Sequence, residues 1–340
     1  MRAVMTNTVF QAVFPLVLLA ALMLGTAQAQ TRQSPSAAPD RADRQAEEYL
    51  SRLFSTREGV EAGATWAARR KWLDLPYATL SPSEKLDIYL PDRPAGRLPD
   101  GGDGPFPVIV AIHGGSFSRG DKRDFQIVPV MAGLDRGYAV VSINYRLSGE
   151  ATFPAQIKDV EAAIRWIRAH AREYSLNPEK IAVWGDSAGG NLAALAGTSG
   201  LTDRFRDAAL GNPDQAGTVD AVVDWYGPVD FLTLGHIARL EKVGNKMIGK
   251  TSLEAPELYL AANPATYAAP DNPPFLIQHG DADQVIPVGQ SIDFAAKLKK
   301  ILGKDKVTLD IVSGADHLDQ KFTTRDNITK VLDFLDKYMK

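Results

Sequence analysis

The sequence predicts one α/β domain, with a doubly wound and mostly parallel sheet and a small cap insertion. Strand-like runs recur at residues 86–91, 107–112, 138–143, 180–184, 219–225, 274–278 and 307–312. Most of these runs are continuously apolar, as strands are when both faces of a parallel sheet are buried. Helical patterns lie between them, at residues 154–172, 188–197, 288–302 and 325–339. Strand alternating with helix is the pattern of a doubly wound fold.

Residues 1–29 are typical of a cleavable export signal. Arg2 is their only charged side chain, an apolar run extends from Ala12 to Leu24, and Ala27-Gln28-Ala29 matches a small-x-small cleavage site. At about 1.5 Å of rise per residue, this run is too short to cross a hydrocarbon core of ~30 Å as a helix. We therefore expect a mature chain from Gln30, periplasmic or secreted, without stable membrane insertion.

A linker and a helical extension are expected over residues 30–71. Residues 31–39 are rich in Ser, Pro and Ala and have little apolar surface to bury. A charged, weakly amphipathic helix is expected to follow, at about residues 40–54.

The catalytic domain is expected over residues 72–340. Its first predicted strand, 86–91, alternates apolar and polar residues and ends at Pro91. Residues 228–262 interrupt the alternation of strands and helices. They are long enough for a cap that is inserted where a strand opens onto the site.

Composition excludes several classes of partner. Apolar residues make up 45% and charged residues 23% of the chain, as in ordinary globular proteins, and the net charge of −3 gives no basic surface for nucleic acid or an anionic membrane. The chain has no cysteine. It therefore has no disulfide framework, thiol nucleophile or thiolate metal site, which is compatible with an oxidising compartment.

Residues 181–192 predict a strand, a sharp turn and a helix, with Ser187 in the turn. The turn reads Gly185-Asp186-Ser187-Ala188-Gly189. A Gly-x-Ser-x-Gly pattern between an apolar strand and an Ala/Leu-rich helix is typical of a nucleophile elbow rather than of a chance glycine-rich turn. Gly185 and Gly189 let strand and helix approach, so the Ser187 hydroxyl projects at the carboxyl edge of the sheet, near the positive end of the helix.

A serine nucleophile needs an imidazole base, and the chain has five histidines, His113, His170, His236, His279 and His317. In proteins with this elbow the serine comes first along the chain, the acid second and the histidine third. His113 and His170 precede the serine, and His236 falls in the expected cap. No acid at a strand end lies between the serine and His279. The predicted base is therefore His317, in the loop after the last strand.

The acid is expected in the carboxylate-rich turn after the strand at 274–278. Asp283 is the preferred residue, because one helix and one strand separate it from His317 and both then lie at neighbouring strand ends. Its role would be to hold the tautomer of His317 and to stabilise the imidazolium. Asp281 is the alternative, and it is expected to organise the turn through its own backbone.

The loop after the strand at 107–112 reads His113-Gly114-Gly115-Ser116 and predicts an oxyanion hole. Glycines allow backbone N–H groups to face a substrate oxygen without a Cβ in the way. The expected donors are the N–H groups of Gly115 and Ala188, with Gly114 or Ser116 as a third.

Trp225 and Tyr226 follow a predicted strand end, with Phe231 a few residues later. We consider them candidates for the wall of a substrate pocket. Core packing or anchoring of the cap is the favoured alternative for each of these aromatic residues.

Motifs along residues 72–338 together resemble the BD-FAE-like branch of the α/β-hydrolases, which is related to the hormone-sensitive-lipase-like esterases. They are Tyr77 with 86–91, His113-Gly114-Gly115 running into Gly120-Asp121-Lys122, 144–147, 153–155, Asp159 with 163–166, 185–190, 279–283 and His317. The resemblance implies an α/β-hydrolase fold and carboxylic-ester hydrolysis without a metal or organic cofactor. Its members include feruloyl, acetyl-xylan and short-chain esterases, so the implied substrate is a small-molecule or polysaccharide-linked ester.

Two departures from that family pattern concern the expected substrate pocket. Ser116 and Phe117 stand where Gly-Trp is common, and Asn191 stands where His is frequent. All three would lie beside the site, so they bear on substrate preference and leave the mechanism intact.

Two other classes of function remain open. A peptidase of prolyl-oligopeptidase type uses the same order of serine, acid and histidine, but no β-propeller repeat precedes the catalytic domain. A catalytically silent binding protein could keep the fold. Such proteins usually lose a member of the triad, whereas this chain retains all three.

Overall fold

A computed structural model describes residues 68–92 and 103–340. The export signal predicted at 1–29 lies outside the described residues, as do the linker and the helix predicted for 31–54. Within the described ranges, no helix combines the length and the apolar character that a bilayer span requires.

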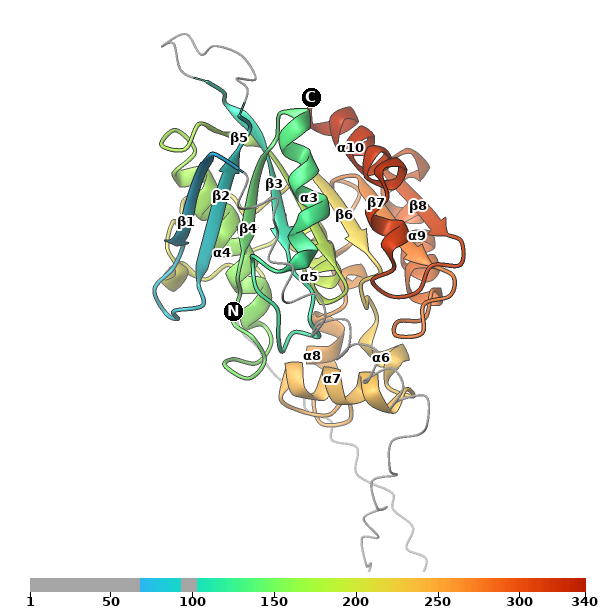
Figure 1. The fold of residues 1–340 in the computed structure, drawn as a ribbon. Helices are drawn as coiled ribbons and strands as arrows, with labels where there is room; N and C mark the ends of the chain where they lie inside the picture. The colour runs from blue at the N-terminus through green and yellow to red at the C-terminus, as the bar shows by residue number, and fades with distance from the viewer. Residues whose placement is uncertain (1–67, 93–102) are drawn as a thin grey trace, which may run out of the picture. The chain divides into compact units, whose positions relative to one another are not determined.

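The described residues build an eight-stranded mixed sheet at the centre of the domain (Figure 1). The strands are β1 (Arg70–Pro76), β2 (Lys85–Leu90), β3 (Phe106–Ile112), β4 (Ala139–Ile143), β5 (Leu176–Asp186), β6 (Ala221–Trp225), β7 (Phe275–Gly280) and β8 (Val307–Val312). Their order is β1-β2-β4-β3-β5-β6-β7-β8. The pairs β1–β2 and β2–β4 are antiparallel and all others are parallel. The predicted fold class is therefore confirmed.

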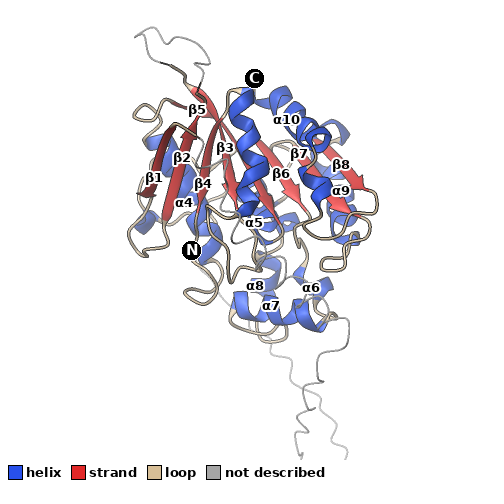
Figure 2. Cartoon of the chain, viewed as in Figure 1, coloured by secondary structure: helices blue, strands red, loops and turns tan. Residues whose placement is uncertain are grey.

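Helices cover both faces of the sheet (Figure 2). The helices outside the segment between β6 and β7 are α3 (Val128–Met131), α4 (Ala155–Ala169), α5 (Ala188–Ser199), α9 (Gly289–Leu302) and α10 (Arg325–Met339). Short 3₁₀ helices span Phe125–Ile127, Ala132–Arg136, Ala208–Leu210, Pro264–Tyr267, Lys304–Lys306 and Gln320–Thr323.

Alternate residues of β3 contribute to two separate cores, because successive side chains of a strand point to opposite faces. Val108 and Val110 pack with α4, α5 and α9 on one face. Ile109 and Ala111 pack with α3 and α10 on the other. This explains why the central strands are apolar at nearly every position.

Three α-helices lie between β6 and β7, within the segment that interrupts the sequence pattern. They are α6 (Phe231–Leu234), α7 (Ala238–Ile248) and α8 (Pro256–Ala261), and they gather at the carboxyl ends of the parallel strands (Figure 1). Leu234 and Leu240 of this cap pack against Val285 and Ile286, which follow β7. The cap is thus seated on the loop that also carries Asp283.

Strand β1 is the largest difference from the predicted elements, since the sequence predicts no strand before residue 86. It is an edge strand, and Trp72 and Leu73 are 38% and 44% exposed. A bulge between Trp72 and Leu75 breaks the two-residue alternation, and the N–H of Asp74 donates to Asp87 Oδ1 at 2.7 Å. A bulged, half-exposed edge strand carries neither of the sequence patterns that reveal a strand.

Candidate active site

Ser187 occupies the sharp turn between β5 and α5. Its φ of 52° and ψ of −118° are strained for a residue with a Cβ. The turn is held from inside the sheet, because the N–H of Ser187 donates to the carbonyl of Trp225 at 2.8 Å. A Cβ on Gly185 would lie 2.1 Å from the carbonyl oxygen of Gly189, and one on Gly189 would lie 2.0 Å from that of Ile112. Both positions therefore require glycine for this close approach.

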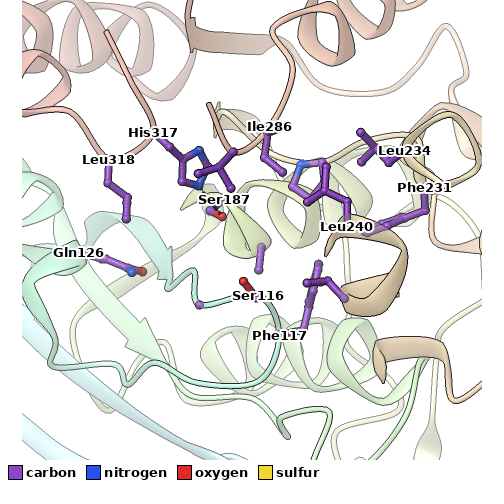
Figure 3. Close-up of a pocket in the computed structure, with 15 residues that line it drawn as sticks. Ser116, Phe117, Gln126, Ser187, Phe231, Leu234, Leu240, Ile286, His317 and Leu318 are labelled. Atoms are coloured by element: carbon purple, nitrogen blue, oxygen red, sulfur yellow. Dashed lines mark hydrogen bonds between the residues drawn. The ribbon is translucent and has the colours of Figure 1, made fainter. Parts of the chain in front are cut away.

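The structure brings Ser187, His317 and Asp283 together, although they come from three different strand ends. Figure 3 shows the first two of these side chains next to each other at the pocket. His317 Nε2 lies 2.9 Å from Ser187 Oγ, and His317 Nδ1 lies 2.8 Å from Asp283 Oδ2. The side chains of His317 and Asp283 are 1% and 0% exposed. This geometry can hold the Nδ1–H tautomer, which leaves Nε2 free to accept the proton of the serine hydroxyl.

Asp283 is kept ionised by its neighbours despite its burial. Burial acts to raise its pKa, but the charge of His317 and hydrogen bonds from His279 and His317 outweigh burial and hold that pKa well below the ordinary 3.8. Its other oxygen, Oδ1, accepts the N–H groups of Val285 and Ile286 at 2.7 and 2.8 Å. A charged carboxylate in this position can stabilise an imidazolium at His317.

Asp281 lies two residues away and faces a different neighbour. Its Oδ1 accepts the backbone N–H of Gly314, in the loop that carries His317. Asp281 is exposed, and its contact joins two loops rather than orienting the imidazole.

His279 is a buried second histidine beside Asp283, and the sequence offers no signal for this contact beyond a histidine at a strand end. Its Nε2 lies 3.0 Å from the carbonyl oxygen of Ile286 and 3.2 Å from Asp283 Oδ2. Both of those oxygens accept, so Nε2 must carry a proton. Its Nδ1 is 2.7 Å from Ser291 Oγ, which fixes the ring from the other side.

The loop predicted to form the oxyanion hole lies against the elbow, and Gly115 and Ala188 both line the pocket at Ser187. Gly115 has a φ of +108°, and a Cβ there would lie 2.2 Å from the carbonyl oxygen of Arg119. Ser116 and Phe117 also have positive φ values, of 54° and 57°. Such strain in consecutive residues is typical of functional loops.

The N–H of Gly114 is not available as the third donor that the sequence predicts. Its N–H donates to Gln126 Oε1, and Gly114 is absent from the pocket lining. Its carbonyl faces His113 Nδ1 at 2.8 Å, while Tyr145 stacks on the His113 ring and donates its hydroxyl to the His113 carbonyl at 2.9 Å. Gly114 thus shapes the loop, and Ser116 is the remaining candidate for a third donor.

The pocket at Ser187 is largely apolar and encloses about 520 Å³ of empty space, including the part open to solvent. Ser116 and Phe117 line it, as the sequence predicts for the substrate pocket. Most other walls come from the cap and from residues that follow β7 and β8. These are Pro228, Phe231, Leu234, Leu240, Val243, Val285, Ile286 and Leu318.

Three predicted pocket residues, Asn191, Trp225 and Tyr226, lie behind the pocket instead. Asn191 is buried under the cap, where its Nδ2 donates to the carbonyls of Pro228 and Ala262 at 2.8 and 3.2 Å. The indole N–H of Trp225 donates to Oε1 of Gln278, a buried residue of β7, at 2.6 Å.

Tyr226 supports the imidazole of His317 from behind. The two rings meet edge to face, with centroids 4.7 Å apart. Tyr226 has a φ of 43°, which turns its chain away from the direction of β6. Trp225 and Tyr226 therefore pack in the core and do not line the pocket, in agreement with the alternative that the sequence favours for these aromatic residues.

In the described part of the chain, no three His, Asp or Glu side chains are grouped so that they could hold a metal ion.

The strand order, the strained serine after β5 and the hydrogen-bonded chain from Ser187 through His317 to Asp283 define an α/β-hydrolase fold with a complete serine–histidine–aspartate constellation. The family model for BD-FAE matches residues 86–298, which is more than half of the chain. The chain belongs to the BD-FAE family, as the resemblance in its motifs implies.

Curated relatives carry esterase names. LipM, a probable carboxylic ester hydrolase of Mycobacterium tuberculosis, is 35% identical over 233 residues, which are 67% of this chain and 52% of LipM. Esterase LipQ of the same organism is 33% identical over 230 residues, covering 66% of this chain and 52% of LipQ. The chain thus spans about half the length of these curated relatives.

Two solved structures are similar to this chain over about four fifths of its length. A truncated carbohydrate esterase from gut microbiota has a TM-score of 0.71 and 31% identity, covering 80% of this chain and 97% of that one. A bifunctional GH43-CE protein of Bacteroides eggerthii has a TM-score of 0.70 and 34% identity, covering 79% of this chain and 38% of that one.

Proposed function

We propose that this protein is a carboxylic ester hydrolase that works through an acyl-enzyme on Ser187. The observation that carries the proposal is the hydrogen-bonded chain from Ser187 Oγ to His317 Nε2 and from His317 Nδ1 to Asp283, at the edge of an apolar pocket. Family membership and the esterase names of the relatives support the same reaction.

In the first half of the proposed reaction, Ser187 Oγ attacks the ester carbonyl while His317 Nε2 takes the hydroxyl proton. The negative oxygen is stabilised by the N–H groups of Gly115 and Ala188, with Ser116 as the candidate for a third. One such donor is typically worth about 2.7–4 kcal/mol in the transition state. Asp283 stays ionised and stabilises the imidazolium throughout.

The imidazolium of His317 then gives its proton to the departing alcohol, which leaves an acyl group on Ser187 and completes the acylation half of the reaction. A water molecule then takes the place of the alcohol, and His317 removes a proton from it as it attacks the acyl carbon. The carboxylic acid departs, and Ser187 regains its proton.

The proposed substrates are short-chain or aryl esters, including esters linked to carbohydrates. The apolar walls from Phe117, Phe231 and Leu240 suit an uncharged acyl group. The names of similar structures, a carbohydrate esterase and a GH43-CE protein, support a sugar or polysaccharide as the alcohol part.

A panel of esters tests this proposal. We expect kcat/KM to be highest for p-nitrophenyl esters of short acyl chains and to fall towards the C12 ester, because Phe231 and Leu240 close the pocket on the cap side. Replacing Leu240 by alanine should move the optimum to longer chains. Methyl ferulate and acetylated xylan in the same panel measure the aryl and carbohydrate preference. Faster cleavage of an aminoacyl-proline anilide than of every ester would instead favour the peptidase.

We also propose that the protein is exported and acts in a periplasm or outside the cell. The support is the pattern of residues 1–29, with its apolar run and the cleavage site at Ala29. N-terminal sequencing of protein expressed with its leader in a bacterial host should find Gln30 as the first residue of the extracytoplasmic fraction. Recovery of the intact Met1 terminus from the cytoplasm alone would contradict export.

A further inference from the structure

Gln126 is a buried amide that faces the pocket and is used only in part by the protein. It is 8% exposed and lines the pocket at Ser187. Its Oε1 accepts the N–H of Gly114. Its Nε2 is buried and has no hydrogen-bond partner among the residues that the structure describes.

The orientation of this amide is determined by its neighbour. If the amide were reversed, Nε2 would face the N–H of Gly114, so that two donors would meet. Oε1 must therefore point to Gly114, and Nε2 remains the unpaired end. A buried donor without a partner is costly, and such groups in folded proteins are rare enough to call for an explanation.

Gln126 lies on the side of the pocket where the alcohol part of an ester must sit. In the view of Figure 3, Gln126, Leu318 and His317 lie on one side of Ser187, and the amide end of Gln126 points toward the middle of the pocket. Phe231, Leu234 and Leu240 lie on the other side.

The proton transfer in the proposed reaction assigns these two sides. His317 Nε2 must reach the oxygen of the departing alcohol, so the alcohol extends on the side of His317. The acyl group then points to the apolar residues of the cap. Gln126, with its unpaired donor, thus lies on the side of the alcohol.

We propose that Gln126 Nε2 donates a hydrogen bond to an oxygen of the substrate's alcohol part and so favours esters of polyhydroxylated alcohols, such as sugars, over alkyl esters. This role rests on the proposed ester hydrolysis at Ser187. It makes Gln126 a residue of substrate specificity, in addition to its hold on the Gly114 loop.

Two acetate esters of nearly equal shape test the proposal. In 2-hydroxyethyl acetate the alcohol part ends in a hydroxyl, and in propyl acetate it ends in a methyl group. We expect Gln126→Leu to lower kcat/KM for 2-hydroxyethyl acetate about tenfold more than for propyl acetate, because one neutral hydrogen bond is lost. The intrinsic reactivities of the two esters cancel when their ratio is compared between variant and parent.

A disturbed Gly114 loop in Gln126→Leu would change kcat/KM in a different way from a lost substrate contact. Both esters use the same oxyanion hole, so both would lose activity by the same factor. Gln126 also lines a second, smaller cavity behind the loop, together with His113 and Asp186. If Gln126 only anchors Gly114, or if its Nε2 binds water in that second cavity, Gln126→Leu lowers both rates by the same factor and the proposal is overturned. Leu318→Ala, on the same side but without a polar group, is the control and should change both rates alike.

The fold and the parent activity are checked separately. If Gln126→Leu does not fold, as judged by its thermal unfolding, Gln126→Met carries the same test with an unbranched side chain. A parent enzyme that hydrolyses neither these acetates nor p-nitrophenyl acetate contradicts the proposed function itself. An active parent with an unchanged ratio in the variant contradicts only the role of Gln126.

Discussion

Replacing Ser187 by alanine is expected to lower kcat for p-nitrophenyl acetate by about a million-fold, close to the typical cost of removing a triad serine. The variant loses the Oγ that lies 2.9 Å from His317 Nε2, so no acyl-enzyme can form. At 25 °C this loss corresponds to about 8 kcal/mol of transition-state stabilisation. The measurement is steady-state hydrolysis at matched protein concentration.

Two controls separate chemistry from folding in this variant. Alanine keeps a Cβ, so the strain of the elbow is the same and the thermal unfolding temperature should change little. Ser313→Ala, at an exposed serine in the loop before His317, should retain the parent rate. A Ser187→Ala variant that hydrolyses short esters as fast as the parent would show that the nucleophile lies elsewhere.

The second large effect is expected from Asp283→Asn, which should lower kcat by about 10⁴-fold. The asparagine amide can present an N–H to His317 Nδ1, which favours the wrong tautomer and leaves Nε2 protonated toward Ser187. It also removes the negative charge that stabilises the imidazolium. Hydrolysis of p-nitrophenyl acetate by the parent and the variant at pH 7 to 8 measures the loss.

Asp281→Asn is the matched control, because the sequence alone leaves Asp281 as the alternative acid. Its Oδ1 contacts the N–H of Gly314 and not the imidazole. We expect a small loss of stability from the loosened loop and a loss of activity far below that of Asp283→Asn. A mild effect at Asp283 together with a severe one at Asp281 would reverse the assignment.

The parts of the site that sequence could predict are those determined by local pattern. The elbow at Ser187 depends on two glycines at a fixed spacing between an apolar strand and a helix. The positions of Asp283 and His317 depend on which strand ends come last along the chain. Parallel strands bring their carboxyl ends to one edge, so this order translates directly into proximity.

The parts that sequence missed depend on contacts between distant segments. Nothing in the sequence around Gly114 indicates that its N–H points to Gln126, since this contact depends on how the loop between them folds back. His279 reaches Asp283 only because the turn after β7 brings both to one place. Asn191, one helical turn after Ser187, could face either the pocket or the cap, and only the packed cap decides between them.

Trp225 and Tyr226 show a further limit of sequence reasoning. Both lie at the end of β6, close to the site in sequence terms. The alternation of side chains along the strand places Trp225 in the core that it shares with α10, and a positive φ turns Tyr226 so that its ring supports His317. Strand-end position alone therefore did not distinguish a pocket wall from a support behind it.

Covalent labelling tests the central claim most directly. A p-nitrophenyl phosphonate or phosphate ester reacts with an activated serine and remains bound as a stable adduct. Intact-mass measurement should show one adduct per chain as esterase activity disappears, and peptide mapping should place it on Ser187. Complete inhibition with the adduct on another residue, or full activity after Ser187 has been labelled, would contradict the assignment of Ser187 as the nucleophile.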